Sequence, residues 1–158
     1  MQPAAAFLNE RKSVTRRAAL MRVAGAMAWM AAPLALPAET GPTRAEWAAI
    51  RKTISQQLAA LRAGDGGRAF GYASPAIQAQ FGDAQTFLDM VRASYSPLLG
   101  ARYTEFLEGA VIDGVIVQPL RLIAPDNTVL VALYTMERQK SGWRISGCQL
   151  APSTVQAA

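Results

Sequence analysis

Three uncharged residues within otherwise apolar segments are the first candidates for a binding site. Gln118, Thr135 and Cys148 carry groups that could orient a small molecule at the base of an apolar pocket. They could equally bond to one another or to neighbouring helices, because buried polar groups in ordinary cores are hydrogen-bonded. Cys148 has no base near it in the sequence, so we interpret it as a small buried apolar group rather than a nucleophile.

Three tyrosines are the second set of candidates. Tyr72, Tyr95 and Tyr134 combine a large apolar area with a hydroxyl, which suits either the rim of a pocket or a core whose phenols reach backbone carbonyls. A tyrosine beside a buried carboxylate would support lyase or isomerase chemistry. Asp89 is the best-placed carboxylate for this role, although helical spacing also puts it beside Arg92 on the solvent side.

The composition excludes several classes of active site. The 158 residues include no histidine, which removes Ser-His-Asp and Cys-His catalysis and histidine-ligated metals. The single cysteine excludes an internal disulfide. We therefore expect no catalytic residue, no metal and no cofactor.

The positive charge of the chain is concentrated near its N-terminus. Five of the 16 Lys and Arg residues and one of the 11 Asp and Glu residues precede residue 39. The remainder has 11 basic and 10 acidic residues, a net charge of +1. A nucleic-acid-binding surface needs Lys and Arg gathered on the folded domain. We expect no nucleic-acid partner.

Residues 1–38 have the three parts of a cleaved export signal. A basic segment over 11–22 precedes an apolar segment over 23–36, and the small residue Ala38 follows. As a helix the apolar segment would reach roughly 21 Å, short of the roughly 30 Å of a bilayer's hydrocarbon core. We therefore expect membrane contact only through this leader, before it is cleaved.

The leader also predicts the cellular location of the protein. Thr15-Arg16-Arg17 followed by Leu20 resembles the twin-arginine export motif, with an ordinary secretory leader as the alternative. Both routes lead to a bacterial periplasm or to the exterior. The remaining chain predicts a single domain over 39–152 and a loose tail over 153–158.

The first part of this domain has helical patterning. Thr43 and Glu46 form a capping box before an apolar face of period 3.6, and Gly64 ends the run. The glycine-rich stretch that follows lacks the ending of a phosphate-binding loop. We interpret its Asp65 as a cap or turn residue.

Two shorter helices are predicted next. Ser74 caps a helix over 75–81 that closes at Gly82, and Asp83 caps a third helix that ends at Ser96-Pro97. The domain therefore begins with three helices.

From Tyr103 onward the pattern is that of consecutive hairpins. We expect four strands in meander order, the first over 103–112 and the second over 115–124. Pro119 cannot donate to a neighbouring strand, so it requires an edge or a bulge. The strands are separated by three turns: Asp113-Gly114, Pro125-Asp126-Asn127 and Lys140-Ser141-Gly142.

Alternation sorts the strand residues into two faces. A two-residue turn at Asp113-Gly114 places Leu107 opposite Leu120 and Gly109 opposite Gln118. Continued across the later turns, one face holds Leu122, Leu120, Gln118, Val131, Leu133, Thr135, Cys148 and Leu150. The other face holds Phe106, Arg121, Tyr134, Met136, Trp143 and Ile145. Both faces are largely apolar and the helices can cover one, so we expect a partner on the second, forming a homodimer.

Several segments resemble a bacterial exported family known as domain of unknown function 4864. The resemblance covers roughly residues 45 to 150, and its most specific part is the string from Ser74 to Gly82. The matching residues are Ala69-Phe70, Tyr72 to Gln78, Phe81-Gly82, Phe87, Met90-Val91, Tyr95, Gly142 to Ile145 and Gly147.

That family is similar to the superfamily of nuclear transport factor two and ketosteroid isomerase. The resemblance implies a cone-shaped, cystatin-like α+β fold, in which three helices pack into a curved four-stranded antiparallel sheet and leave a pocket. It implies no functional residues, because the family has no assigned activity.

Our hypothesis is an exported domain that binds a small apolar molecule or an envelope protein in a concave pocket, without catalysis. Its pocket candidates are the three tyrosines with Gln118, Thr135 and Cys148. The alternative is a lyase or isomerase that uses a buried carboxylate and a tyrosine.

Overall fold

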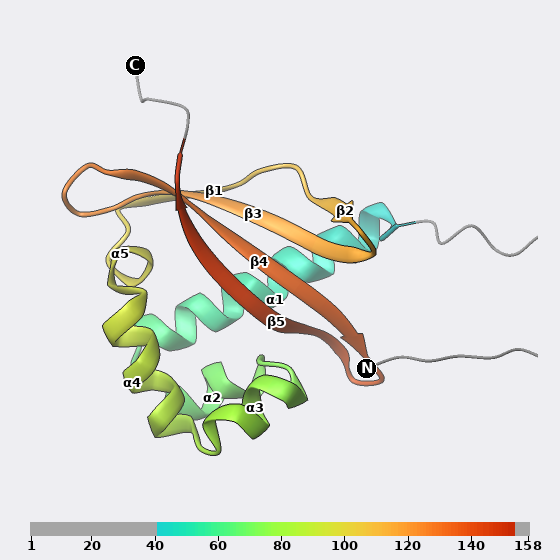
Figure 1. Ribbon diagram of the computed structural model, residues 1–158, viewed down its shortest axis with the longest axis horizontal. Helices are drawn as coiled ribbons and strands as arrows, with labels where there is room; N and C mark the ends of the chain where they lie inside the picture. Colours follow the sequence, from blue (N-terminus) through green and yellow to red (C-terminus); the bar gives the residue numbers. More distant parts are fainter. Residues whose placement is uncertain (1–40, 154–158) are drawn as a thin grey trace, which may run out of the picture. The chain divides into compact units, whose positions relative to one another are not determined.

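The helices of this chain pack against one face of a twisted antiparallel sheet (Figure 1). The computed structural model describes residues 41–153, within which the chain forms five helices and five strands of an α+β fold. The sheet is open and is not closed into a barrel. The predicted leader, 1–38, and all but the first residue of the predicted tail lie outside the described residues.

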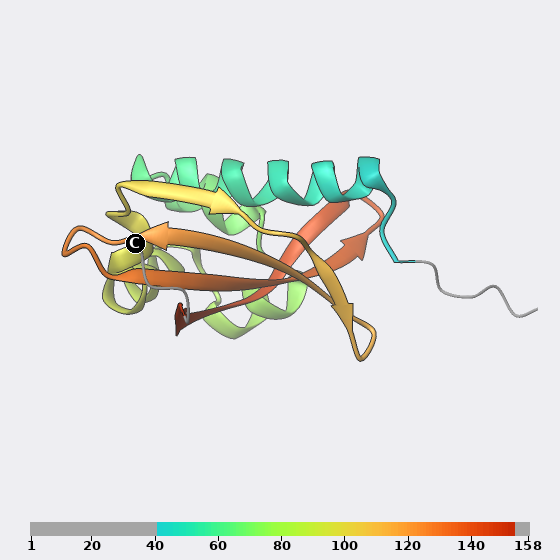
Figure 2. The ribbon, with the colours of Figure 1, turned by 90° about the horizontal axis from the view of Figure 1, so that it is seen from above.

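The longest helix, α1 (Arg44–Arg62), begins at the predicted capping box. The Thr43 hydroxyl accepts a hydrogen bond from the Glu46 amide at 3.3 Å, and the Glu46 carboxylate accepts one from the Thr43 amide at 2.8 Å. The predicted apolar face is confirmed, since Ile50 and Ile54 are completely buried. Figure 2 shows α1 running along the sheet.

The two shorter predicted helices are also confirmed. The Ser74 hydroxyl caps α3 (Pro75–Phe81), and the Asp83 carboxylate caps α4 (Ala84–Ser94). Gly82 ends α3 with a φ of 78°, a conformation that favours glycine. These boundaries are local, so the sequence predicts them well.

Two further helices were not predicted, so the count of three helices is wrong. α2 (Gly66–Gly71) begins and ends with glycine, a poor helix former, and α5 (Ser96–Leu99) is a single turn. The Asp65 carboxylate caps α2, which confirms its predicted role as a cap. Tertiary packing holds α2 in place, because Ala69 is completely buried within a cluster formed by α1, α2 and α4.

The sheet has one more strand than predicted. Its order is β1-β3-β4-β5, and β2 pairs with residues 115–117 at the start of β3. The predicted strand over 103–112 therefore forms two separate strands, β1 and β2, and both of them pair with β3. The strands are β1 (Tyr103–Phe106), β2 (Ala110–Ile112), β3 (Val115–Ile123), β4 (Val129–Gln139) and β5 (Gly142–Pro152).

Pro119 and Trp47 explain the break between β1 and β2. The Leu107 amide donates to the Pro119 carbonyl at 3.1 Å, and Pro119 has no amide to donate in return. The Trp47 ring lies so close to Gly109 that an added Cβ would be 2.3 Å from it. The side-chain amide of Gln118 donates from Nε2 to the Leu107 carbonyl at 2.8 Å. Of the two predicted settings for Pro119, the edge is wrong, because β3 has neighbours on both sides. The bulge is the one that agrees, since residues 107–109 face only residues 118–119.

The break shifts the register by one residue. Beside the Asp113-Gly114 turn, β2 pairs with β3 as a two-residue turn predicts, with Ile112 opposite Val115. Beyond the break, however, Phe106 rather than Leu107 lies opposite Leu120. Gly109 lies in the break, outside both paired segments, so its predicted pairing with Gln118 is wrong.

The predicted register of β4 is wrong as well. Gln118 lies opposite Tyr134, and Thr135 lies opposite Val117. Thr135, Val131 and Leu133 are therefore on the outer face, away from the helices. Several residues assigned to the other face instead share the inner face with Leu120 and Leu122: Phe106, Tyr134, Met136, Trp143 and Ile145.

A bulge in β5 sets the geometry of its inner face. Tyr134 pairs with Cys148 and Met136 pairs with Ile145, so β5 has one extra residue, Ser146, between them. Because of this extra residue, Ile145 and Cys148 both face the helices, although they are three positions apart.

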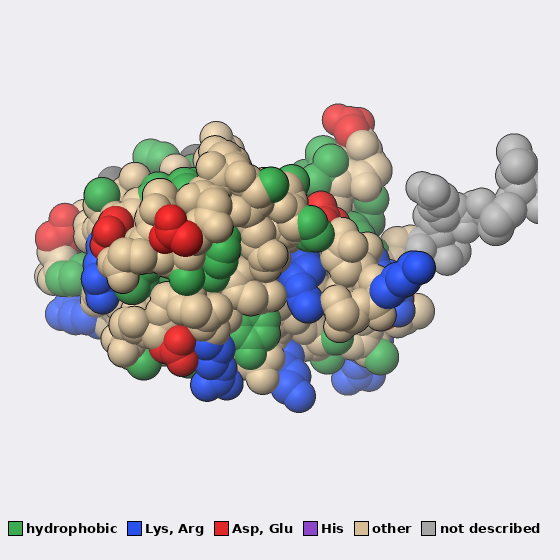
Figure 3. Space-filling view, turned by 90° about the horizontal axis from the view of Figure 1, so that it is seen from below, with side chains coloured by type: hydrophobic (Ala, Val, Ile, Leu, Met, Phe, Trp, Pro, Cys, Tyr) green, Lys and Arg blue, Asp and Glu red, His purple; other side chains and the backbone are tan. Residues whose placement is uncertain are grey.

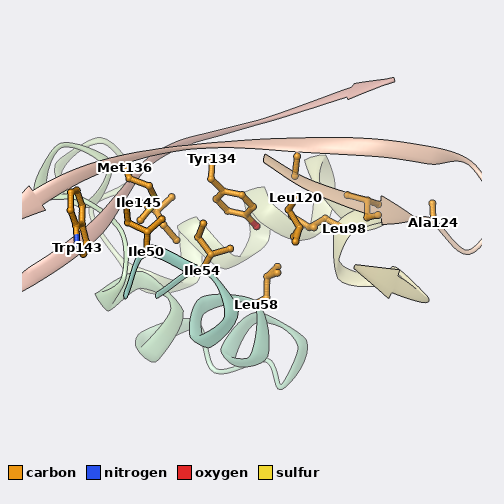
Figure 4. Close-up of a cluster of buried hydrophobic side chains, with 12 residues drawn as sticks. Ile50, Ile54, Leu58, Leu98, Leu120, Ala124, Tyr134, Met136, Trp143 and Ile145 are labelled. Atoms are coloured by element: carbon orange, nitrogen blue, oxygen red, sulfur yellow. The ribbon is translucent and has the colours of Figure 1, made fainter. Parts of the chain in front are cut away.

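The inner face carries the larger of two apolar clusters. Figure 4 shows Tyr134 pointing from β4 toward the helices, near Ile54 and Leu120. A second cluster, centred on Phe87 and Leu88, joins α1, α2 and α4. No helix within residues 41–153 is long and apolar enough to span a bilayer.

Candidate ligand-binding cavity

A cavity of about 250 Å³ lies where the two apolar clusters meet. Its walls come from α1, α3, α4, α5 and β5, with Tyr134 of β4 at the sheet. The apolar part of the lining is formed by Leu61, Ala73, Ile77, Phe81, Phe87, Met90, Val91, Leu98 and Ile145.

Tyr95 and Tyr134 bring hydroxyl groups to this cavity. The Tyr95 hydroxyl donates to the backbone carbonyl of Cys148 at 2.6 Å. Burial raises the pKa of the Tyr95 phenol. Tyr134 is buried more completely, and this burial raises its pKa well above the usual 10.0. Both phenols are therefore neutral across the physiological pH range.

Cys148 lies between the two tyrosines. Its side chain forms a hydrogen bond with the Tyr134 phenol, and burial raises the pKa of its thiol from 9.0 to about 12. The thiol is therefore protonated near neutral pH, which makes it a poor nucleophile. The raised pKa agrees with the sequence interpretation of Cys148 as a poor nucleophile, although the residue is only partly buried.

Gln57 is a cavity residue that the sequence analysis missed. It is only 4% exposed and lines the cavity from α1. Its Nε2 donates to the Ala69 carbonyl at 3.2 Å, which fixes the orientation of the amide. The only signal for it in the sequence is the position of a glutamine on the buried side of an amphipathic helix.

The structure places three of the six predicted site residues elsewhere. Tyr72 packs against the larger apolar cluster and does not line the cavity. Gln118 is completely buried beside the β1–β2 break. Thr135 lies on the outer face, where its hydroxyl meets that of Ser146 at 3.1 Å. Only Tyr95, Tyr134 and Cys148 come together at the cavity, and the register of β4 is the reason that Tyr134 rather than Thr135 is on the inner face.

The cavity lining contains no carboxylate from the described part of the chain. Asp89 has a side chain that is 63% exposed and accepts a hydrogen bond from Gln85 at 2.9 Å. Its position on the wet side of α4 follows from helical spacing. Within residues 41–153, no three His, Cys, Asp or Glu residues lie close enough together to hold a metal ion.

The charged groups lie on the surface. Figure 3 shows Lys and Arg scattered among Asp and Glu on the face seen from below. Arg121 pairs with Glu105 on the outer face of the sheet, and Arg138 pairs with Glu46 near the start of α1. Neither pair contributes to the cavity lining.

Comparison with known proteins gives a family but no activity. No curated protein matches this chain. A family model does match, over residues 43–158, and these include every residue of the cavity. The chain belongs to the family described as Domain of unknown function (DUF4864).

Proposed function

We propose that this protein binds a small apolar molecule in the cavity between the helices and β5. The observation that carries the proposal is the lining itself, which is apolar over most of its area and includes a few neutral polar groups. Ligand sites of this kind combine apolar walls with a small number of convergent polar groups.

A second proposal concerns the origin and location of the protein. We propose an exported bacterial protein of the nuclear transport factor two-like superfamily, with the leader over 1–38 as its export signal. Helices packed on one face of a twisted antiparallel sheet support the superfamily assignment. Cell fractionation that finds the intact leader and the whole chain in the cytoplasm would refute export.

The lyase or isomerase alternative finds no support in the cavity. Such a reaction needs a carboxylate within reach of a phenol, and the residues that line the cavity beside Tyr95 and Tyr134 include none. The homodimer stays a prediction. Its candidate surface is the outer face of the sheet, which carries Val131 and Leu133.

Binding is tested by native mass spectrometry of the full chain after incubation with a mixture of small apolar compounds. We expect one molecule to be retained per chain. Met90→Trp fills part of the cavity and should abolish retention, whereas Ala93→Trp places the same ring on the exposed side of α4 and should not. Retention of nothing by the unmodified chain, or equal retention by Met90→Trp, would refute the proposal.

A further inference from the structure

The polar groups of the cavity wall indicate what kind of molecule it accepts. We infer that the cavity selects a neutral apolar molecule that donates a hydrogen bond, such as an alcohol or a phenol, and that Gln57 Oε1 is the acceptor. This inference rests on the proposed binding function and adds the chemical class of the ligand.

The orientation of the Gln57 amide is fixed by its neighbour. The Ala69 carbonyl can only accept, so Nε2 must face it, and Oε1 must point the other way. Among the described residues, none donates a hydrogen bond to Oε1. In the described part of the chain, Gln118 Oε1 is the only side-chain oxygen that is both inaccessible to solvent and without a hydrogen-bond partner. Gln57 Oε1 also has no partner there, so it must be accessible. Because Gln57 is only 4% exposed and lines the cavity, we infer that Oε1 is accessible from the cavity.

The hydroxyl groups of the cavity lining already donate their protons to hydrogen bonds within the protein. The Tyr95 proton is donated to the Cys148 carbonyl, and the Ser146 hydroxyl donates to Thr135 Oγ1 at 3.1 Å. The Tyr134 phenol is hydrogen-bonded to the Cys148 thiol. Each phenolic oxygen still has lone pairs, so it can accept a further hydrogen bond. Around Gln57 the buried part of the wall therefore offers acceptors, and a ligand bound there must bring the proton. The other amide in the lining, Gln80, belongs to an exposed residue of α3.

An anionic ligand finds no partner on this wall. The described residues that line the cavity include neither Lys nor Arg. The nearby guanidinium of Arg62 is engaged by the carbonyls of Leu98 and Leu99, at 3.3 and 3.2 Å. A carboxylate entering the cavity would lose its hydration without a compensating charge, which is strongly unfavourable.

The volume of the cavity sets the size of the test ligands. A space of about 250 Å³ corresponds to roughly eight water molecules at roughly 30 Å³ each. 1-Octanol is a suitable probe, and two molecules of similar size complete the set. 1-Methoxyheptane is an isomer of octanol without the hydroxyl proton, and octanoate has a similar chain with a negative charge.

The experiment measures the affinity of the full chain for each probe by isothermal titration calorimetry. We expect octanol to bind about tenfold more tightly than 1-methoxyheptane, because one buried hydrogen bond is worth roughly a factor of 3 to 10. We expect octanoate to bind at least tenfold more weakly than octanol. Gln57→Leu should remove the difference between octanol and 1-methoxyheptane. Gln56→Leu, the same change at the neighbouring position outside the cavity lining, should preserve it.

The outcomes separate this inference from the proposed function. If 1-methoxyheptane or octanoate binds as tightly as octanol, the cavity binds ligands but the inference is wrong. If none of the three probes binds, the proposed function fails and the inference fails with it. Should Gln57→Leu not fold, the three affinities measured on the unmodified chain still decide the question.

Discussion

The hydrogen bond from Tyr95 to Cys148 connects the end of α4 to β5, across 53 positions of sequence. Replacing Tyr95 with phenylalanine keeps the ring in place and removes only the donor. The Cys148 carbonyl then loses its partner at a partly buried site, where solvent replaces the hydrogen bond incompletely. We expect Tyr95→Phe to destabilise the fold without changing its architecture.

The size of the effect follows from the geometry. The bond is short, at 2.6 Å, and the acceptor is a backbone carbonyl, so the loss should be about 1–2 kcal/mol. For a domain of this size, 1 kcal/mol shifts the melting temperature by about 4 °C. The expected decrease in Tm is therefore about 4–8 °C.

The assay is thermal unfolding of the full chain, followed by circular dichroism at neutral pH. Tyr103→Phe is the matched control, because Tyr103 is 51% exposed and its hydroxyl forms no hydrogen bond with the described residues. The control should melt within about 1 °C of the unmodified chain. If Tyr95→Phe melts at the same temperature as the control, the Tyr95 hydroxyl does not hold α4 to β5 and our reasoning is wrong.

Two further predictions concern the β1–β2 break and the cavity thiol. Gly109→Ala should cost about 1–3 kcal/mol, because its Cβ would overlap the Trp47 ring, whereas Gly71→Ala, with nothing within 4 Å, should be nearly neutral in the same melts. Equal melting temperatures of the two variants would contradict this packing. Since burial raises the pKa of Cys148 from 9.0 to about 12, its thiolate fraction at pH 8 should be about a thousandfold lower than in the unfolded chain. Its reaction with Ellman's reagent should slow accordingly. Because the folded pKa is the higher one, the stability from this group is full below pH 9.0 and is lost as the pH rises toward about 12. A Cys148→Ala variant should show a weaker alkaline loss in urea unfolding, and an identical loss would refute the assignment.

Much of the fold follows from local sequence signals. The capping box at Thr43, the Ser74 and Asp83 caps and the Asp113-Gly114 turn all act within a few residues, and each is confirmed by the structure. Pro119 also signals an irregularity, because a residue without an amide cannot complete a ladder. These features depend only on the chemistry of neighbouring residues.

The parts that were missed depend on contacts between distant residues. α2 begins and ends with glycine, and it packs into a cluster with α1 and α4. The position of the break between β1 and β2 depends on Trp47, which lies more than fifty positions away in the sequence. The error in β4 has a different origin, because a shift of one residue turns every side chain of a strand to the other face. The register of β4 is set at the 125–127 turn, where the Ala124 amide donates to the Thr128 carbonyl, so Tyr134 rather than Thr135 shares the face of Gln118.

By itself, the sequence determined which residue types are available for chemistry. It contains no histidine and a single cysteine, so its composition alone excludes the classes of site that need more of either. The tertiary structure decided which groups meet. Gln57, Tyr95 and Cys148 come from three different elements, and they line one cavity only because the β5 bulge and the packing of α4 bring them together. A cavity is defined by the distances between elements, and those distances are set by the packing of the whole domain.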